Sequence, residues 1–552
     1  MRTGGQIVVD ALRIHGADTV FCVPGESYLP VLDALHGAGD AIRLITCRHE
    51  GGAANMADSH GKLTGKPGIC FVTRGPGATN ASIGVHTAFQ DSTPMILFVG
   101  QVHRGHLGRE AFQEVDFTKM FGDMTKWTAQ VDDPARLPEF ISRAFHTATS
   151  GRPGPVVLAL PQDILSQQCQ TADLKPYQVI QPSPADGDID QLVAMLSKAE
   201  RPFVMLGGSG WSREACADIR TFIEANNLPA GVSFRCQDLL DNSSPSYAGH
   251  IGIGISPKLA ERVTGADLIV AIGPRLGEMT TGGYTLLDAP RTRQKLVHVH
   301  AGAEELNRVY QADLAINAGV GTLGRKLRRR AAAEPGRWAE WTAGARADYE
   351  AFIEPVPCPG ALDLAAIFIA LRQHLPDDAI ITNGAGNYTA WSHRFHQFRS
   401  YRSQIAPTSG AMGYGLPAAI AAKIAASERC VVALAGDGCF LMTGQELATA
   451  VQYRANVIVL IINNSMYGTI RMHQERNYPG RVCGTSLENP DFAAYAWAFG
   501  AYSEIVETTD QFLPAFDRAM KSGKPAVLEL RVDPEALAPG KTLSGVRAEA
   551  PH

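Results

Sequence analysis

Residues 436–468 read GDGCFLMTGQELATAVQYRANVIVLIINNSMYG, and this stretch decides the fold of the last third of the chain. An apolar run at 431–434 leads into the Gly-Asp-Gly turn, and a second run at 457–462 leads into two asparagines, the later being Asn464. Continuous apolar runs are typical of strands buried on both faces of a parallel sheet. Because parallel strands joined by a helix end at the same edge of the sheet, the pattern predicts that Asp437 and Asn464 lie side by side.

The residue types at this edge favour a phosphate group and a metal ion. Glycines at 436 and 438 allow backbone N–H groups to approach a phosphate closely. One carboxylate, one amide oxygen and a nearby main-chain carbonyl form a half-shell of oxygens, which suits Mg²⁺ when a diphosphate supplies further ligands. Between the two strands, Thr443 and Glu446 have the spacing of a capping box, which predicts a helix from Thr443 through Ala450 toward Tyr453.

The composition of the chain excludes several classes of function. A net charge of −5 over 552 residues gives no basic field of the kind that a nucleic-acid-binding protein needs. No apolar run reaches the length of a membrane span, and the N-terminus carries a capping box at Thr3 and Gln6 in place of a signal peptide. The ten cysteines form no CxxC pair, so we expect reduced thiols and no zinc site. We therefore predict a cytoplasmic protein with no nucleic-acid or membrane partner.

Three passages share a single design, which is an apolar strand followed by a glycine turn, at 66–77, 201–210 and 428–438. They predict an α/β chain of three doubly wound parallel-sheet domains, whose ligands sit beyond the carboxyl ends of the strands. Proline-rich stretches at 174–188 and 355–363 read as linkers. The predicted ranges are an N-terminal domain at 1–175, a central domain at 185–345, a C-terminal domain at 357–535 and a tail at 536–552, which is either an arm or lid or disordered.

Further motifs place the sequence in a known family. They are FCVPGESYLP (21–30), RHEGGAANMAD (48–58), TRGPGATN (73–80), DSTPM (91–95), AFQE (111–114) and SGAMGYGLPAAI (409–420). With the GDG and NN pattern, they make the chain similar to thiamine diphosphate-dependent enzymes of the pyruvate-oxidase type, and within these to the large, catalytic subunit of acetolactate synthase. This resemblance implies a pyrimidine-binding, a central Rossmann-like and a diphosphate-binding domain, with thiamine diphosphate and Mg²⁺ as cofactors.

The resemblance also assigns roles to residues. Glu50 is the glutamate that hydrogen-bonds the aminopyrimidine ring, and Met412 is the wedge between the two rings of the cofactor. Metal ligands are Asp437, Asn464 and the carbonyl of Met466. Cofactor contacts are expected from Pro24, Glu50, Pro76, Asn80, Ala385, Gly386, Asn387, Tyr388, Gly410, Met412, Gly436, Asp437, Gly438, Cys439, Asn464, Met466, Tyr467 and Gly468. Catalytic residues are Glu50, Phe112 and Gln113, and the substrate pocket is expected at Gly25, Glu26, Lys126, Met279 and His473.

The implied reaction is the decarboxylation of a 2-oxoacid, pyruvate by default, with ligation of the remaining acyl unit to an acceptor carbonyl, either a second oxoacid or an aldehyde. Because Glu50 and the GDG turn lie in different domains, and the family's cofactor spans two subunits, we expect a homodimer or homotetramer with active sites at the interface. Two alternatives stay open. One is a non-oxidative 2-oxoacid decarboxylase or aldehyde lyase, and the other is a non-catalytic relative of the same fold.

Several residues depart from the acetolactate synthase pattern. Met279 replaces an arginine that binds the acceptor carboxylate, and His473 replaces a tryptophan of the substrate pocket. Loss of the charged clamp should cost on the order of 1.5–3 kcal/mol in holding a second oxoacid, so the acceptor could be an aldehyde, water or another neutral species. Glu26 replaces a glycine near the reactive carbon, and three alternatives stay open for it: a proton shuttle, a group that excludes anionic acceptors, or an outward-facing glutamate of the turn, which is the usual place of such a residue. FAD stays an open alternative, since GGSGW (207–211) and Arg275 match its site whereas His300 stands where an aspartate is usual.

Overall fold

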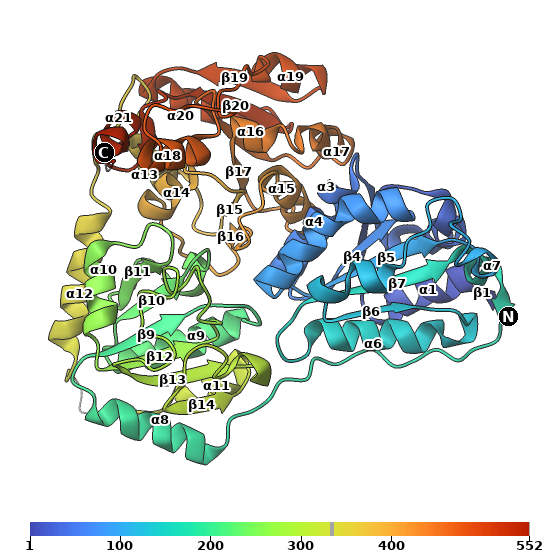
Figure 1. Cartoon of the computed structure of the whole chain (residues 1–552), viewed down its shortest axis with the longest axis horizontal. Coiled ribbons are helices and arrows are strands. Elements are labelled where there is room, and N and C mark those ends of the chain that lie inside the picture. Colours follow the sequence, from blue (N-terminus) through green and yellow to red (C-terminus); the bar gives the residue numbers. More distant parts are fainter. Residues whose placement is uncertain (332–335, 551–552) are drawn as a thin grey trace.

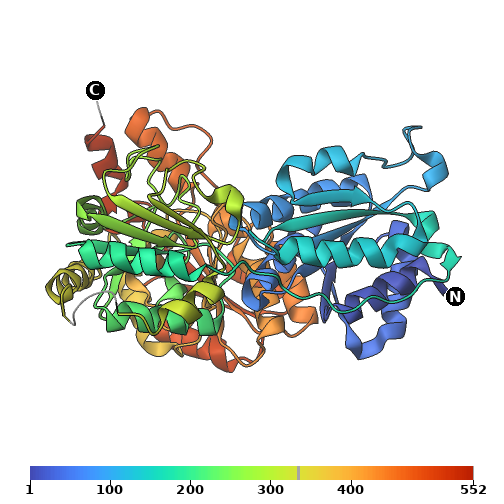
Figure 2. The same cartoon turned by 90° about the horizontal axis from the view of Figure 1, so that it is seen from below.

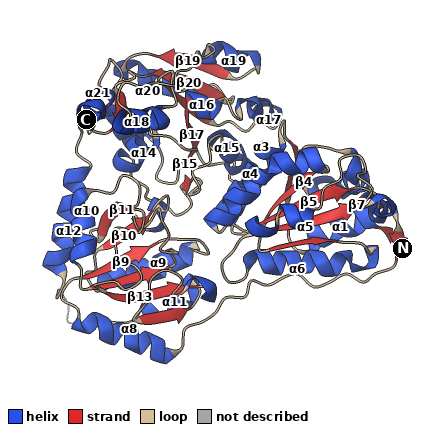
Figure 3. Cartoon of the chain, in the orientation of Figure 1, coloured by secondary structure: helices blue, strands red, loops and turns tan. Residues whose placement is uncertain are grey.

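The computed structural model describes residues 1–331 and 336–550, and it contains three six-stranded parallel sheets, one in each predicted domain range. Helices cover both faces of each sheet (Figures 1 and 3). The prediction of three doubly wound α/β units is therefore confirmed. Figure 2 shows the linker before residue 186 running along one side of the molecule, from the first domain to the central one.

The first sheet has the strand order β3-β2-β4-β5-β7-β6. Most of its side chains are buried on both faces, as the continuous apolar runs predicted. Its strands are β2 (Thr19–Cys22), β3 (Arg43–Thr46), β4 (Gly68–Val72), β5 (Met95–Gln101), β6 (Trp127–Gln130) and β7 (Pro155–Pro161). Its main helices are α1 (Gly4–Ile14), α2 (Leu29–Ala38), α3 (Glu50–Thr64), α4 (Gly75–Asp91) and α6 (Leu137–Thr149), with shorter ones at α5 (Phe117–Met120) and α7 (Gln162–Ser166). Thr3 and Gln6 form the predicted capping box of α1, and β1 (Arg2–Thr3) pairs with β8 (Gln168–Cys169).

The third sheet repeats this order as β16-β15-β17-β18-β20-β19. Its strands are β15 (Ile380–Asn383), β16 (Gln404–Ile405), β17 (Val431–Gly436), β18 (Ile458–Asn463), β19 (Tyr502–Val506) and β20 (Ala526–Arg531). Its helices are α13 (Leu364–His374), α14 (Thr389–Phe395), α15 (Gly415–Ala425), α16 (Asp437–Phe440), α17 (Leu447–Gln452), α18 (Gly468–Asn477), α19 (Phe492–Ala498) and α20 (Thr509–Lys521).

The central sheet has a different order, β11-β10-β9-β12-β13-β14, which is the Rossmann order that the resemblance implied. Its strands are β9 (Pro202–Leu206), β10 (Ala230–Ser233), β11 (Tyr247–Ile251), β12 (Leu268–Ile272), β13 (Lys295–His300) and β14 (Leu314–Asn317). Its helices are α8 (Asp186–Lys198), α9 (Arg213–Ala225), α10 (Pro257–Gly265), α11 (Val320–Leu327) and α12 (Ala339–Phe352).

Each sheet has a point within it at which the chain turns from building one side of the sheet to building the other. In the first sheet it lies between β2 and β4, in the central sheet between β9 and β12, and in the third between β15 and β17. The connections on either side of such a point leave in opposite directions, which opens a crevice at the carboxyl ends of the strands. The glycine turns singled out in the sequence all follow one of these strands.

Helices α3 and α15 join the first domain to the third (Figure 1). Both are rich in glycine and alanine and almost entirely buried, which lets their backbones approach closely. The Asp58 carboxylate on α3 accepts a hydrogen bond of 2.5 Å from the Tyr414 hydroxyl, just before α15, and pairs with Lys62 at 2.7 Å. A buried carboxylate with two such partners fixes the contact between the domains.

The helix predicted from Thr443 toward Tyr453 is present, but its capping box is not. Thr443 is the N-cap of a 3₁₀ helix, η8 (Gly444–Glu446), which leads directly into α17, and it makes no side-chain cap hydrogen bond. The Thr443 hydroxyl donates to the carbonyl of Gly413, and the Glu446 carboxylate accepts the backbone N–H groups of Arg48 and His49 at 2.9–3.3 Å. Both side chains of the expected capping box therefore serve distant parts of the chain, and Glu446 holds the turn that starts α3.

The tail is ordered over the described residues, as β21 (Ala536–Ala538), β22 (Lys541–Thr542) and α21 (Leu543–Ala548). Leu537, Leu543 and Val546 pack around Met466. The buried carboxylate of Glu475 on α18 accepts two hydrogen bonds from Arg547 on α21, at 2.7 and 2.8 Å. These bonds are the main cause that lowers the pKa of Glu475 to about 2.

We predict that Glu475→Gln loosens the tail. Losing the charged hydrogen bonds should cost about 1–3 kcal/mol, so amide hydrogen exchange in residues 543–548 should be faster than in the wild type. Because the pKa of Glu475 is lowered in the folded chain, its stabilisation is present above about pH 4.5 and is lost as the pH falls toward 2. Wild-type exchange protection should therefore persist at pH 5. Glu261→Gln, which removes an exposed carboxylate paired with Lys258, is the control, and equal tail exchange in both variants would contradict the clamp.

Candidate active site

A cavity of about 260 Å³ lies where the strand order of the third sheet reverses. It is lined by every residue of this domain that was predicted to contact the cofactor. These are Ala385, Gly386, Asn387, Tyr388, Gly410, Met412, Gly436, Asp437, Gly438, Cys439, Asn464, Met466, Tyr467 and Gly468. The remaining lining is mostly apolar and includes Ile462, Ile470, Val532 and Leu537, the last from the tail.

The predicted metal ligands meet at one side of this cavity. Asp437 is 2% exposed at the start of α16, and burial raises the pKa of its carboxyl group. Asn464 lies beyond β18, and its side-chain oxygen accepts the backbone N–H of Met466 at 3.3 Å. One carboxylate and two neutral oxygens fill half of an octahedron, so these residues fit Mg²⁺ whose other ligands come from a diphosphate. No cluster of three His, Cys, Asp or Glu side chains that would hold a metal ion by itself occurs among the described residues.

The two asparagines of the NN pair differ in their contacts. Asn463 donates to the Glu529 carboxylate at 2.8 Å, and its own side-chain oxygen accepts the backbone N–H of Ser465. It therefore secures the end of β18, whereas Asn464 lines the cavity.

The two glycines of the turn lie against tyrosine rings. A Cβ atom on Gly438 would lie 2.5 Å from the ring of Tyr467, and one on Gly436 would lie 3.2 Å from the ring of Tyr388. Tyr388 itself is buried, and its hydroxyl accepts the backbone N–H of Gly384 at 3.1 Å. The two tyrosine rings therefore require glycine here, and because both glycines line the cavity they present backbone without side chains to a bound diphosphate.

Cys439 joins the metal turn to the loop that carries Met412. Its sulfur accepts the backbone N–H of Gly413 at 3.1 Å. Gly410, at φ +70°, has open space where a Cβ would lie. The loop predicted to hold a pyrimidine ring is thereby fixed relative to the metal ligands.

A second group of predicted residues gathers where the strand order of the first sheet reverses. Glu50 is the first residue of α3, and it accepts a hydrogen bond of 2.9 Å from the amide of Asn80 on α4. Pro76 lies near the start of α4 and is exposed, as is Pro24, which follows β2 with Gly25. A Cβ on Gly25 would lie 2.5 Å from that of Thr73, so the turns after β2 and β4 touch.

The loop after β5 borders the same edge. Gln113 adopts φ +65°, and its carbonyl accepts the backbone N–H of Gly75 at 3.0 Å. Phe112, one residue earlier, is 73% exposed. An exposed aromatic side chain of this size, near the start of α4, suits a surface that another chain or a ligand covers.

The two groups are separate within one chain. The cavity that contains Asp437 and Met412 is lined by residues between Leu364 and Leu537, all from the third domain and the tail. Glu50 and the other predicted residues of the first domain do not line it. Each chain thus carries two half-sites.

Three predicted substrate residues lie apart from both groups. Lys126 precedes β6, at the amino edge of the first sheet, and its ammonium group donates to the carbonyl of Ser150. This is the edge opposite Glu50, so its position does not support the predicted substrate contact. Met279 lies in the central domain, near Arg275 and Gln90. His473 is exposed on α18 and does not line the cavity.

Other residues of the site were not predicted from the sequence. Asn489 donates to the Asp437 carboxylate at 2.8 Å and to the Asn463 side chain at 3.0 Å. Thr469 exchanges hydrogen bonds with Asn387. Asn489 lies in a loop with no strand, helix or glycine pattern to mark it, so only the folded chain reveals its contact.

Comparison with protein families assigns these domains. Models of the thiamine pyrophosphate enzymes match their N-terminal TPP binding domain to residues 2–120, their central domain to 189–327 and their C-terminal TPP binding domain to 384–530. The chain belongs to the thiamine pyrophosphate enzyme family. Thiamine pyrophosphate is thiamine diphosphate, so the cofactor-binding domains that the resemblance implied are confirmed.

Relatives of this thiamine pyrophosphate enzyme include acetolactate synthases. It is 34% identical to the acetolactate synthase large subunit of Parasynechococcus marenigrum, over 96% of this chain and 87% of the relative. It is 32% identical to the isozyme 2 large subunit of Escherichia coli, over 96% and 95%. It is 31% identical to the mitochondrial catalytic subunit of Saccharomyces cerevisiae, over 96% and 81%. Among the described helices, none has the length and apolar character to cross a membrane.

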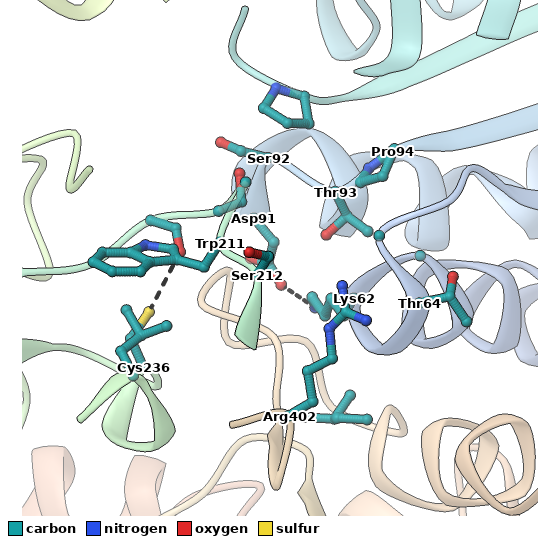
Figure 4. A pocket seen from close by; sticks show the side chains of 18 of the residues that line it. Lys62, Thr64, Asp91, Ser92, Thr93, Pro94, Trp211, Ser212, Cys236 and Arg402 are labelled. Atoms are coloured by element: carbon teal, nitrogen blue, oxygen red, sulfur yellow. Dashed lines mark hydrogen bonds and ion pairs between the residues drawn. The ribbon is translucent and has the colours of Figure 1, made fainter. Parts of the chain in front are cut away.

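A further cavity of about 340 Å³ lies where the three domains meet (Figure 4). Figure 4 shows Lys62 and Asp91 of the first domain close to Trp211 of the central domain and Arg402 of the third. The lining of this cavity includes most of the GGSGW turn, which was predicted to form part of a flavin site. A Cβ on Gly208 would lie 2.1 Å from the carbonyl oxygen of Gly273. The close approach of two backbone turns therefore accounts for this glycine without a ligand.

The other residues expected around a flavin are also engaged within the protein. Arg275 donates to the buried Glu305 carboxylate and to the carbonyl of Gln90. His300, at the end of β13, accepts the backbone N–H of Gly302 and offers no carboxylate to a ribose. These contacts account for the residues without a flavin, and FAD binding stays a prediction of the resemblance.

We predict that Asn489→Ala weakens Mg²⁺ binding by about 10–100-fold, because partners that orient a metal ligand typically contribute that much to metal affinity. Calorimetric titration of Mg²⁺ in the presence of thiamine diphosphate measures it. Asn477→Ala, at the exposed end of α18, is the matched control. Equal Mg²⁺ affinity in the two variants would show that Asn489 does not hold Asp437 in its binding position.

Proposed function

We propose that this enzyme decarboxylates a 2-oxoacid, with pyruvate as the default donor, and joins the remaining acyl group to the carbonyl carbon of an acceptor. The observation that carries the proposal is the cavity of the third domain, where metal ligands, glycine turn and Met412 all meet. The relatives named acetolactate synthase, at 31–34% identity over nearly the whole chain, support this reaction class.

When bound, thiamine diphosphate supplies a cationic thiazolium ring that accepts the electron pair released with CO₂. Asp437, Asn464 and the Met466 carbonyl would hold Mg²⁺ and, through it, the diphosphate. Met412 and the backbone of Gly410 would hold the pyrimidine ring. A polarisable and flexible thioether suits a position between two rings.

Glu50 would hold a proton at the pyrimidine nitrogen. Its carboxylate is kept in place by the Asn80 amide at 2.9 Å and by its position at the first residue of α3. Glu446 holds the turn before α3, because its carboxylate accepts the backbone N–H groups of that turn. A glutamate secured from both sides presents its proton at a defined point, as general acid–base catalysis requires.

We also propose that the active enzyme is a homodimer, or a tetramer of two dimers. The Glu50 half-site of one chain would face the cofactor cavity of the other. The separation of the two half-sites within one chain and the exposure of Phe112, Pro76 and Asn80 beside Glu50 support this arrangement.

Activity is tested with pyruvate, thiamine diphosphate and Mg²⁺, alone and with a panel of aldehydes and 2-oxoacids as acceptors. We expect CO₂ release together with a ligated 2-hydroxyketone or acetolactate. Acetaldehyde without any ligated product would favour a decarboxylase. No CO₂ from any 2-oxoacid would contradict the proposal.

Glu50→Gln should leave cofactor affinity within about threefold, because the cavity of the third domain is intact, and should slow proton exchange at the thiazolium carbon by at least about a hundredfold. Nuclear magnetic resonance after quenched deuterium exchange measures that rate. Asp18→Asn, an exposed acid outside the site, is the control. An unchanged exchange rate in Glu50→Gln would remove this residue from its proposed role.

A further inference from the structure

Arg74 connects three loops at the carboxyl edge of the first sheet. It is the residue before α4, and its side chain is only 8% exposed. Its guanidinium lies 3.3 Å from the Glu26 carboxylate, beyond β2. It also donates to the carbonyl of Phe112, beyond β5, at 3.5 Å, and to the side chain of Gln162, beyond β7, at 2.6 Å. One buried cation thus holds the loops that border Glu50.

The two partners of the ion pair between Arg74 and Glu26 differ in their exposure to solvent. Glu26 is 67% exposed, whereas the guanidinium is buried. Among the described residues, Glu26 is the only carboxylate within 4 Å of Arg74. A group that approaches this edge therefore meets the negative end of the pair, and the positive charge stays behind it.

Glu26 also belongs to the same small surface as Glu50. Its neighbour Gly25 lies against Thr73, and a Cβ on Gly77 would lie 3.1 Å from Thr73 and 3.5 Å from the Glu50 carboxylate. Ser27, on the other side of Glu26, shares a hydrogen bond of 2.9 Å with Thr73, so the turn that carries Glu26 packs against the strand end that leads to α4. The exposed Glu26 carboxylate therefore lies at the same edge of the sheet as Glu50, the edge that a substrate would approach.

We propose that Arg74 is a positioning residue that fixes Glu26 at the reactive edge, and that Glu26 selects a neutral aldehyde as acceptor over a second 2-oxoacid. This inference rests on the proposed carboligation. It assigns the acceptor's charge, which that proposal left open. Like charges repel when they are held close together, and a fixed repulsive group is a common source of specificity.

The donor escapes the repulsion and an anionic acceptor does not. In the reaction, the bond between the donor's carbonyl carbon and its carboxylate breaks, and the carboxylate leaves as CO₂. The electron pair then forms the new bond to the acceptor carbonyl carbon, whose oxygen takes up a proton. Repulsion of the donor's carboxylate by Glu26 is therefore relieved as CO₂ departs. The carboxylate of a 2-oxoacid acceptor stays in the product, so its repulsion persists through ligation.

The test compares acceptors that differ in charge, with pyruvate as a saturating donor. Glyoxylate is the anionic acceptor, and glycolaldehyde is the neutral one. We expect Glu26→Gln to raise the ratio of kcat/KM for glyoxylate to that for glycolaldehyde by about tenfold, through a lower KM for glyoxylate. CO₂ release is followed in the same reactions, and thermal unfolding shows that each variant is folded.

Variants of Arg74 separate positioning from simple loss of structure. Arg74→Met should raise the same ratio, because Glu26 is no longer held, and should also lower kcat for both acceptors, because the loop of Phe112 loses its contact. Arg74→Lys keeps the positive charge, so its ratio should stay near the wild-type value. Glu139→Gln is the control. It removes an exposed carboxylate of α6 that pairs with Arg136, and it should leave both the ratio and kcat unchanged.

The outcomes distinguish the two proposals. A ratio in Glu26→Gln within twofold of the wild type, with CO₂ release intact, would overturn this inference alone. A wild type that prefers glyoxylate to glycolaldehyde would overturn it as well. No CO₂ from any donor would overturn the proposed function on which it rests.

Discussion

The parallel direction of all strands within each main sheet is the constraint on which the site depends. Parallel strands send every following turn to the same edge, and a reversal of strand order opens a crevice between two of those turns. The turn after β17 carries Asp437 and the turn after β15 carries Ala385 to Tyr388, so the crevice of the third sheet collects metal ligands and glycines. The crevice of the first sheet collects Glu50 and its neighbours in the same way.

A rigid contact between the domains sets where these two crevices lie. Helices α3 and α15 pack through small residues, and Asp58, Lys62 and Tyr414 join them in a buried charged cluster. Glu446 adds a second link between the domains. It lies a few residues after Asp437 in the sequence, and its carboxylate accepts the backbone N–H groups of the two residues before Glu50. Within one chain this frame keeps the half-sites apart. The account therefore places the complete site between two chains.

Local signals in the sequence were enough to predict much of this. Apolar runs mark buried strands and glycine turns mark their ends, so the three sheets and the cavity around Asp437 and Asn464 follow from neighbouring residues. Contacts between residues far apart in the sequence could not be predicted from such local patterns. Thr443 and Glu446 look like a helix cap but bond to Gly413 and to the start of α3, some 30 to 398 residues away in the sequence. Asn489 and the pairing of Arg74 with Glu26 carry no local mark either.

The central claim is that one active site needs Glu50 from one chain and Asp437 from another. It is tested most directly by mixing two variants, Glu50→Gln and Asp437→Asn, each inactive alone, under conditions that exchange subunits. Random exchange would make half of the dimers mixed, each with one intact site, so activity should return to about a quarter of the wild-type level. Activity that stays at the level of the separate variants, although mixed dimers form, would show that each site is built within a single chain and would contradict the account.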